Sequence, residues 1–195
     1  DHSGDCKAPC FMACPTHQDI QGYVGLIANG KEKEALELIK KDNPLPASIG
    51  RVCPHPCEEK CRRKHLEGAV SICALKRFAA DSCEDYIPEC AEYNGKNIAV
   101  VGGGPAGLSC AYFLALKGYK VKILESEEKA GGMLRYGIPF YRLPENVLDK
   151  EICENVAKEV EKEFGPCDIL INGAGGNSPK ATTDKEYFEI GDIDA

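Results

Sequence analysis

The stretch KNIAVVGGGPAGLSCAYFLALKGYKVKILE, from Lys96 to Glu125, decides the fold, because its hydrophobic pattern changes from strand to helix and back. Ile98 to Val101 is a β-branched run typical of a buried parallel strand, and a helical pattern follows as far as Gly118. Tyr119 to Leu124 has the composition of a second strand. The order strand, glycine turn, helix, strand predicts a βαβ dinucleotide-binding unit.

Three glycines with the spacing G-x-G-x-x-G follow the first strand directly. Gly102 would permit the tight turn, Gly104 would let the backbone approach a pyrophosphate, and Gly107 would let the helix lie close to the strand. The helix would then point its unpaired N–H groups at the phosphates. Glu125 ends the second strand, where a carboxylate can accept both hydroxyls of an adenosine ribose. The predicted cofactor-binding residues here are Gly102, Gly104, Pro105, Ala106, Gly107 and Glu125.

The composition sets limits on partners and compartment. The 195 residues are 43% hydrophobic, which is enough for one compact domain or two small ones. A net charge of -7 disfavours nucleic acid and anionic membranes as partners, and no apolar run approaches the length of a membrane span. We expect a cytoplasmic protein without a signal peptide. Because the sequence begins at Asp1, we also expect it to be part of a longer chain.

Seven of the twelve cysteines gather in the first 73 residues. Two runs share the spacing C-x₃-C-x₃-C, and a proline follows the last cysteine of the first run and the first cysteine of the second. A Cys-Pro step is typical of iron–sulfur ligands, since proline directs the chain away from the cluster. Two [4Fe–4S] clusters need about eight ligands. The predicted metal ligands are Cys6, Cys10, Cys14, Cys53, Cys57, Cys61 and Cys73.

Disulfides and zinc are the alternatives for these cysteines. Disulfides would require an oxidising compartment, which the nucleotide-binding unit and the absent signal peptide argue against. Zinc sites usually pair two short C-x₂₋₄-C knuckles. Here helical patterns at Asp19 to Ala28 and Lys31 to Lys41, with a turn at Gly30, separate the two runs. A small α-helical domain with cysteines at its helix ends favours cubane clusters, and zinc remains the alternative.

Two cysteine-containing motifs carry a family resemblance. CKAPCFMACP, from Cys6, and NPLPASIGRVCPHPCEEKC, from Asn43, resemble the N-terminal iron–sulfur domain of the glutamate synthase small-subunit family, which dihydropyrimidine dehydrogenase shares. GGMLRYGIPFYRLP, from Gly131 to Pro144, is similar to the segment that follows the second strand in this family. The resemblance covers about residues 1 to 152.

The resemblance implies that the two cysteine runs interleave. In this family the cluster ligands alternate between the runs, and a further cysteine lies just before the position of Cys6, where this sequence reads DHSGD. We expect that ligand to lie upstream of Asp1. One cluster would be held by Cys6, Cys10 and Cys61, and the other by Cys14, Cys53 and Cys57.

Cys73 is our candidate for the remaining ligand of the second cluster. Dihydropyrimidine dehydrogenase resembles this chain around SICALKRFAAD but has a glutamine where this sequence has Lys76. Cys73 lies one helical turn before Lys76, on the same helix face. The alternative interpretation of Cys73 is a buried free thiol.

The same resemblance implies that FAD, and not NAD, occupies the Gly102 motif, because in this family a later glycine fingerprint holds the nicotinamide. This sequence has no later G-x-G-x-x-G. Gly131, Gly132 and Met133 would pass under the pyrophosphate, and Arg142 would lie near the cofactor. The alternative for Arg142 is a surface salt bridge.

The resemblance ends after Ile152. ENVAKEVEKEFGPCDILINGAGGNSPKATT resembles a short-chain dehydrogenase around its Asn-x-Ala-Gly motif, here Asn172 to Gly175, which suggests a fusion or chimera. Tyr187 lacks the lysine of a Tyr-x-x-x-Lys pair, so no catalytic residue is assigned. A helix over 147–164 and a strand over 168–171 would add a third parallel strand to the sheet.

We therefore expect an α plus α/β protein. A helical [4Fe–4S] domain would occupy residues 1–93, a partial Rossmann-like, FAD-binding parallel sheet residues 94–152, and the short-chain-dehydrogenase-like segment residues 153–195. The resemblance implies an NAD(P)H:acceptor oxidoreductase, in which electrons from this small-molecule donor pass through FAD and up to two clusters to a redox partner subunit or domain. The alternatives are a non-catalytic electron-transfer or assembly module and a zinc-stabilised nucleotide-binding dehydrogenase.

Overall fold

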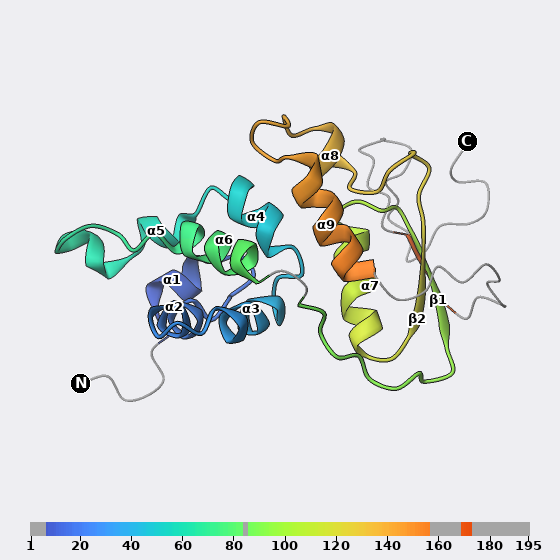
Figure 1. Ribbon diagram of the computed structural model, residues 1–195, viewed down its shortest axis with the longest axis horizontal. Helices are drawn as coiled ribbons and strands as arrows, with labels where there is room; N and C mark the ends of the chain where they lie inside the picture. Colours follow the sequence, from blue (N-terminus) through green and yellow to red (C-terminus); the bar gives the residue numbers. More distant parts are fainter. Residues whose placement is uncertain (1–6, 84–85, 157–168, 173–195) are drawn as a thin grey trace, which may run out of the picture.

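The computed structural model describes residues 7–83, 86–156 and 169–172. Short helices come first, and a parallel sheet with helices packed on it follows, so the predicted fold class is confirmed (Figure 1). No helix in these ranges is long and apolar enough to cross a membrane. The first part contains α1 (Pro9–Ala13), α2 (Ile20–Ala28), α3 (Glu32–Lys40), α4 (Pro46–Val52), α5 (Pro56–Glu59), the 3₁₀ helix η1 (Arg62–His65) and α6 (Ile72–Ser82). The second part contains β1 (Asn97–Val101), α7 (Pro105–Leu116), β2 (Lys120–Leu124), α8 (Met133–Tyr136), α9 (Glu145–Val156) and β3 (Ile169–Asn172).

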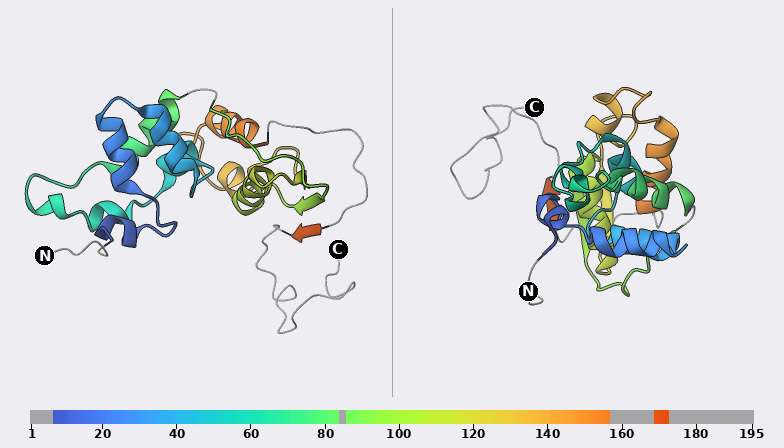
Figure 2. Two further views of the ribbon diagram at one scale, coloured as in Figure 1. Left: turned by 90° about the horizontal axis from the view of Figure 1, so that it is seen from below. Right: turned by 90° about the vertical axis from the view of Figure 1, so that its left-hand side faces the viewer.

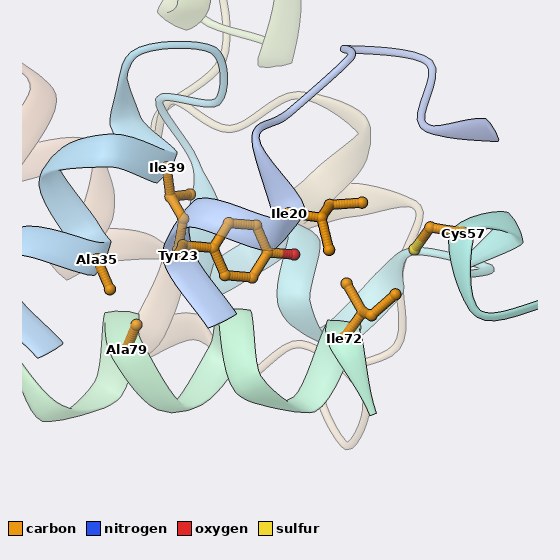
Figure 3. Close-up of a cluster of buried hydrophobic side chains, with 7 residues drawn as sticks. All are labelled: Ile20, Tyr23, Ala35, Ile39, Cys57, Ile72 and Ala79. Carbon is orange, nitrogen blue, oxygen red and sulfur yellow. The ribbon is translucent and has the colours of Figure 1, made fainter. Parts of the chain in front are cut away.

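The helical part is built around an antiparallel pair, α2 and α3, which α6 covers. Both predicted helices are present, with Asp19 accepting the Gly22 N–H as the N-cap of α2 and Gly30 at φ +69° in the turn. Their apolar faces meet α6 in one small core (Figure 3). The residues of this core are Ile20, Tyr23, Ala35, Ile39, Cys57, Ile72 and Ala79. Because Cys57 belongs to it, the core reaches one of the predicted cluster ligands.

The sheet has the order β2-β1-β3, and all pairings are parallel. Val101 pairs with Leu124 on β2 and with Asn172 on β3, so the strands end at the same edge. The predicted third parallel strand is therefore confirmed, one residue later than expected. The helix predicted over 147–164, ahead of this strand, is α9. It begins at Glu145, two residues earlier than expected, and the predicted residues 157–164 lie outside the described ranges.

The two parts of the molecule pack against each other through α9, which lies between α4 and α7 (Figure 1 and the left view of Figure 2). Leu45, which precedes α4, shares a buried cluster with Leu134, Leu143 and Leu148 of the second part. The Tyr112 hydroxyl also donates to the Lys40 carbonyl across this boundary, at 3.3 Å. Apolar burial and hydrogen bonding therefore hold the two parts together.

Glu151 makes a polar link across the same boundary. Its side chain extends from α9, is 2% exposed, and accepts hydrogen bonds from the backbone N–H groups of Ala47 at 2.6 Å and Ser48 at 2.9 Å. These N–H groups belong to the first turn of α4, where a helix has no backbone acceptors of its own. Burial raises the pKa of Glu151, and the two N–H donors and the Lys40 charge oppose this rise.

Replacing Glu151 with alanine should destabilise the protein by about 2 to 4 kcal/mol, because two buried N–H groups lose their acceptors. Chemical denaturation of the apo chain would measure this difference. Glu145→Ala is the matched control, since its side chain is 62% exposed, and it should cost less than about 1 kcal/mol. Equal losses in the two variants would contradict the assigned role of Glu151.

Candidate functional site

Cys14 and Cys53 each end a helix. Both are C-cap residues in extended conformation, with ψ of 123° after α1 and 135° after α4, and proline follows each. Proline cannot continue a helix and disfavours helical geometry in the residue before it. The two Cys-Pro steps therefore turn the chain at the point where a thiol is presented.

Four cysteines from different parts of the helical domain line one pocket. Cys14 follows α1, Cys53 follows α4, Cys57 lies on α5 and Cys73 on α6. No Asp or Glu lines this pocket. Its other lining residues are Pro15, Gln18, Ile20, Tyr23, His55, Pro56, Ile72 and Lys76. A donor set made of thiols, enclosed by apolar side chains, fits the ligand requirements of an iron–sulfur cluster.

Cys73 is tied to its neighbours at both its backbone and its side chain. Its N–H donates to Glu58 on α5 at 2.8 Å, and its thiol donates to the carbonyl of Gly50 on α4 at 3.4 Å. Glu58 thus caps the N-terminus of α6 from a neighbouring helix. These bonds join α6 to α5, which carries Cys57, and to α4, which precedes Cys53.

The loop between Cys53 and Cys57 adopts an unusual backbone conformation. His55 has φ +47° and ψ 54°, which lies in the left-handed region, and prolines flank it on both sides. A non-glycine residue there costs on the order of 1 kcal/mol or more. The conformation directs the His55 N–H to the Cys53 sulfur, at 3.3 Å. Such N–H donors are among the groups that tune a cluster through its sulfurs.

The thiols of this pocket differ in acidity. Burial, with the neighbouring Cys14 and Cys53, raises the pKa of Cys57 to about 11, and burial also raises the pKa of Cys73. Burial acts in the same direction on Cys14, but hydrogen bonds involving Thr16 and Gln18 outweigh it and leave the pKa of Cys14 below its ordinary value. Cluster binding would therefore release protons from Cys57 and Cys73.

The geometry of a single metal ion is not assembled in the described part of the chain. A tetrahedral zinc ion bound at about 2.3 Å needs its sulfurs within about 3.8 Å of one another. Among the described residues no three His, Cys, Asp or Glu side chains form a group that could hold one ion. Four thiols around one pocket, without such a group of three, suit a larger cluster better than a zinc ion.

The first predicted cluster is described only in part. Cys10, on α1, and Cys61, which precedes η1, lie near enough for their charges to interact, and burial is the main cause of the raised pKa of Cys10. Cys6 lies outside the described residues. Cys10 thus lies near Cys61, and near Cys14 as well, and the interleaved assignment of the two clusters stays a prediction.

The glycine turn lies at the carboxyl end of β1. Gly102 has φ +96°, and a Cβ on Gly107 would lie 1.9 Å from the Gly102 carbonyl oxygen, so both positions require glycine. A Cβ on Gly104 would meet nothing nearer than 3.9 Å. Pro105 and Ala106 are exposed in the first turn of α7, which has no side-chain cap. β2 and β3 lie on opposite sides of β1, so the chain leaves β1 toward one side of the sheet and later returns on the other. A nucleotide is expected to bind in the crevice where the strand order changes in this way.

Glu125 faces this turn from the end of β2. Its carboxylate accepts hydrogen bonds from the N–H groups of Gly103 at 2.6 Å, Ser126 at 2.8 Å and Glu127 at 3.1 Å. The N–H groups of Glu127 and Gly103 hold the pKa of Glu125 below its ordinary value, and burial opposes them weakly. The side chain is therefore an ionised acceptor beside the glycine turn.

A second glycine loop packs against the first. The Gly131 N–H donates to the Gly103 carbonyl at 2.8 Å, and a Cβ on Gly132 would lie 2.9 Å from the Gly104 Cα. Met133, which follows, is 70% exposed, and Arg142 is exposed on a later loop. The structure thus brings Gly131 and Gly132 to the turn, and the role of Arg142 stays a prediction.

Sequence reasoning did not identify two buried cations near these sites. Arg135 on α8 is 5% exposed in its side chain, donates to the Ala130 carbonyl at 2.8 Å and bonds to Asp149, so it fixes the second glycine loop to α9. Lys76 is 6% exposed and lines the thiol pocket. Its position three residues after Cys73 was the available signal. The Asn172–Gly175 motif begins at the end of β3, and its residues 173–175 lie outside the described ranges.

A thiol-lined pocket in a helical domain, followed by a dinucleotide-binding βαβ unit, defines a class of redox proteins that combine iron–sulfur clusters with a nucleotide. Residues 3–86 match the family described as dihydropyrimidine dehydrogenase domain II, 4Fe-4S cluster. Residues 100–150 match the NAD(P)-binding Rossmann-like domain. The chain belongs to the dihydropyrimidine dehydrogenase-like family of iron–sulfur oxidoreductases, which confirms the resemblance.

Three relatives show the range of this family. The NADPH-Fe(3+) oxidoreductase subunit beta of Geobacter sulfurreducens is 44% identical over 74% of this chain and 22% of its own length. The NADP(+)-dependent formate dehydrogenase subunit beta of Moorella thermoacetica is 42% identical over 74% of this chain and 24% of its own. The PreT homolog of Salmonella typhi, named a subunit of NAD-dependent dihydropyrimidine dehydrogenase, is 36% identical over 94% of this chain and 44% of its own length. The chain thus spans less than half the length of these relatives.

Gly104→Ala should separate nucleotide binding from stability. The new Cβ has room in the protein but would project where a pyrophosphate approaches, so we expect dinucleotide affinity to fall at least about tenfold with the melting temperature unchanged. Gly107→Ala is the comparison, because its Cβ would collide with backbone and cost about 1 to 3 kcal/mol. Fluorescence titration with FAD and with NAD, beside thermal denaturation, would test both variants. Unchanged affinity in Gly104→Ala would place the dinucleotide elsewhere.

Proposed function

We propose that this chain is the electron-transferring part of an NAD(P)H-dependent iron–sulfur flavoprotein oxidoreductase, resembling the small subunit of glutamate synthase. The observation that carries the proposal is the pocket shared by Cys14, Cys53, Cys57 and Cys73. In this proposal the helical [4Fe–4S] domain occupies residues 1–93 and the FAD-binding half-domain residues 94–152. The remaining segment, 153–195, adds the third strand to the sheet.

The pocket supports a [4Fe–4S] cluster held by these four cysteines. Its donors are all sulfur, they come from separate helices, and apolar residues such as Ile20 and Ile72 limit the access of water. The first predicted cluster would use Cys6, Cys10 and Cys61 as three of its ligands. The matched 4Fe-4S family model supports the same cofactor.

FAD is our choice for the dinucleotide at the Gly102 turn. An ionised carboxylate at Glu125 suits free ribose hydroxyls and would repel a 2′-phosphate, so the site suits FAD or NAD better than NADP. Relatives whose names specify NADPH or NADP(+) nevertheless share this part of the chain. If the whole protein uses an NADP cofactor, this half-site is better suited to the flavin. Gly131, Gly132 and Met133 would line its pyrophosphate, and Arg142 would approach it from the later loop.

When bound, the flavin accepts a hydride and the clusters carry single electrons onward. The residues of this chain bind and orient both groups. The N-terminus of α7 would neutralise the pyrophosphate, and α4 and α9 hold the flavin half-site and the thiol pocket in one packed unit. We assign no catalytic residue for NAD(P)H oxidation in this chain.

The names of the relatives support a redox partner subunit, since two are called subunit beta. The ten described cysteines are free thiols, which suits the reducing cytoplasm that we propose as the location. NAD(P)H would be the small-molecule electron donor of the whole protein.

Anaerobic reconstitution tests the cluster proposal. We expect at least about four iron and four sulfide per chain, and we expect Cys73→Ala to change the electron paramagnetic resonance of one cluster while FAD binding persists. Cys83→Ala, at the other end of α6, is the matched control and should leave the resonance unchanged. Stoichiometric zinc in place of iron would reject the clusters. An unchanged resonance in Cys73→Ala would leave Cys73 as a structural thiol.

A second prediction concerns turnover by the 195-residue chain. Hydride transfer requires the nicotinamide to be held about 3 to 3.5 Å from the flavin, and the one G-x-G-x-x-G of this sequence is assigned to FAD. We expect dithionite to reduce the bound flavin but NADH and NADPH to do so slowly. Stopped-flow absorbance would measure the rates, with free FAD as the control. Bleaching by NADPH within seconds would reveal a nicotinamide site in this chain.

A further inference from the structure

Lys76 is the buried charge that the proposed cluster ligands do not explain. It lies on α6 one turn after Cys73, and 6% of the residue is exposed. Its side chain lines the pocket together with the four thiols. Among the described residues it forms no salt bridge, and no acidic side chain lines the pocket.

Burying an ammonium group without an anion costs several kcal/mol, so such groups are normally paired. Glu58, an acid whose charge acts on Cys57 and Cys73, already accepts the Cys73 N–H and faces His55. The groups that the Lys76 charge acts on are thiols. Burial is the largest influence on the pKa of Cys14, Cys57 and Cys73 and raises it, and the charge of Lys76 acts in the opposite direction on all three.

A cluster with four thiolate ligands carries a net negative charge, and that charge grows by one when the cluster accepts an electron. A fixed cation beside the cluster favours the more negative form, and the effect is large where water is excluded. We propose that Lys76 raises the reduction potential of the cluster held by Cys14, Cys53, Cys57 and Cys73. The inference rests on the proposed function, since it requires that cluster to be present.

The test is a potentiometric titration of the reconstituted 195-residue chain, with dithionite as the one-electron reductant. The resonance that Cys53→Ala removes identifies the cluster in this pocket. In Lys76→Met we expect the equilibrium constant for its reduction to fall at least about tenfold, which lowers the potential by about 59 mV for a one-electron couple. Methionine keeps an unbranched side chain, one atom shorter than that of lysine, but removes its charge and offers no oxygen ligand.

Two further variants separate charge from structure. Lys41→Met, at the exposed C-cap of α3, makes the same charge change away from the pocket and should leave the potential unchanged. Lys76→Arg keeps a charge that cannot be deprotonated and should stay within a factor of about three of the wild type. Loss of the cluster in Lys76→Met but not in Lys76→Arg would also support the inference.

Other results would overturn it. An unshifted potential in Lys76→Met, with a normal cluster, would overturn the inference alone. Loss of the cluster in both Lys76 variants would show that this lysine shapes the pocket and does not tune the cluster. A wild-type chain without iron or sulfide would overturn the proposed function itself, and the inference with it.

Discussion

The hydrogen bonds between Glu151 and the first turn of α4 fix α4, a helix of the first part, to α9 of the second part. α4 is held at its N-terminus by a carboxylate of the second part, and its C-terminus carries Cys53. Between these ends the Gly50 carbonyl accepts the thiol of Cys73 on α6. The positions of two thiols relative to the glycine turn therefore depend on a helix that both parts bind.

A helix of seven residues has little stability of its own, so α4 depends on these contacts. Leu45, just before α4, packs in the buried cluster with Leu134, Leu143 and Leu148. Near the end of α4, Arg51 forms a bidentate salt bridge with Asp81 on α6. If the proposed cofactors are bound, this packed boundary would keep their separation constant.

The parts of the fold that the sequence predicted are those encoded locally. The βαβ unit followed from hydrophobic periods and the glycine spacing, and two equally spaced cysteine runs with prolines indicated an iron–sulfur domain. The partners of Glu151 lie 103 and 104 residues away in sequence, so no local pattern indicated that link. The left-handed His55 and the burial of Lys76 likewise result from tertiary packing, which single-residue propensities do not encode. The interleaving of the cysteine runs is a prediction from family resemblance, which spacing alone did not indicate.

The two buried charges near the boundary and the pocket lead to different conclusions. Glu151 is buried, and backbone N–H groups and the nearby Lys40 satisfy it, so the protein alone explains its position. Lys76 is buried to a similar degree, yet no carboxylate lines its pocket, and burial raises the pKa of the neighbouring thiols of Cys57 and Cys73. Because its partners all belong to the folded chain, Glu151 has a structural role. Lys76 has no acidic partner in its pocket, which supports the proposal that an anionic cluster bound by the surrounding thiols is the group beside this charge.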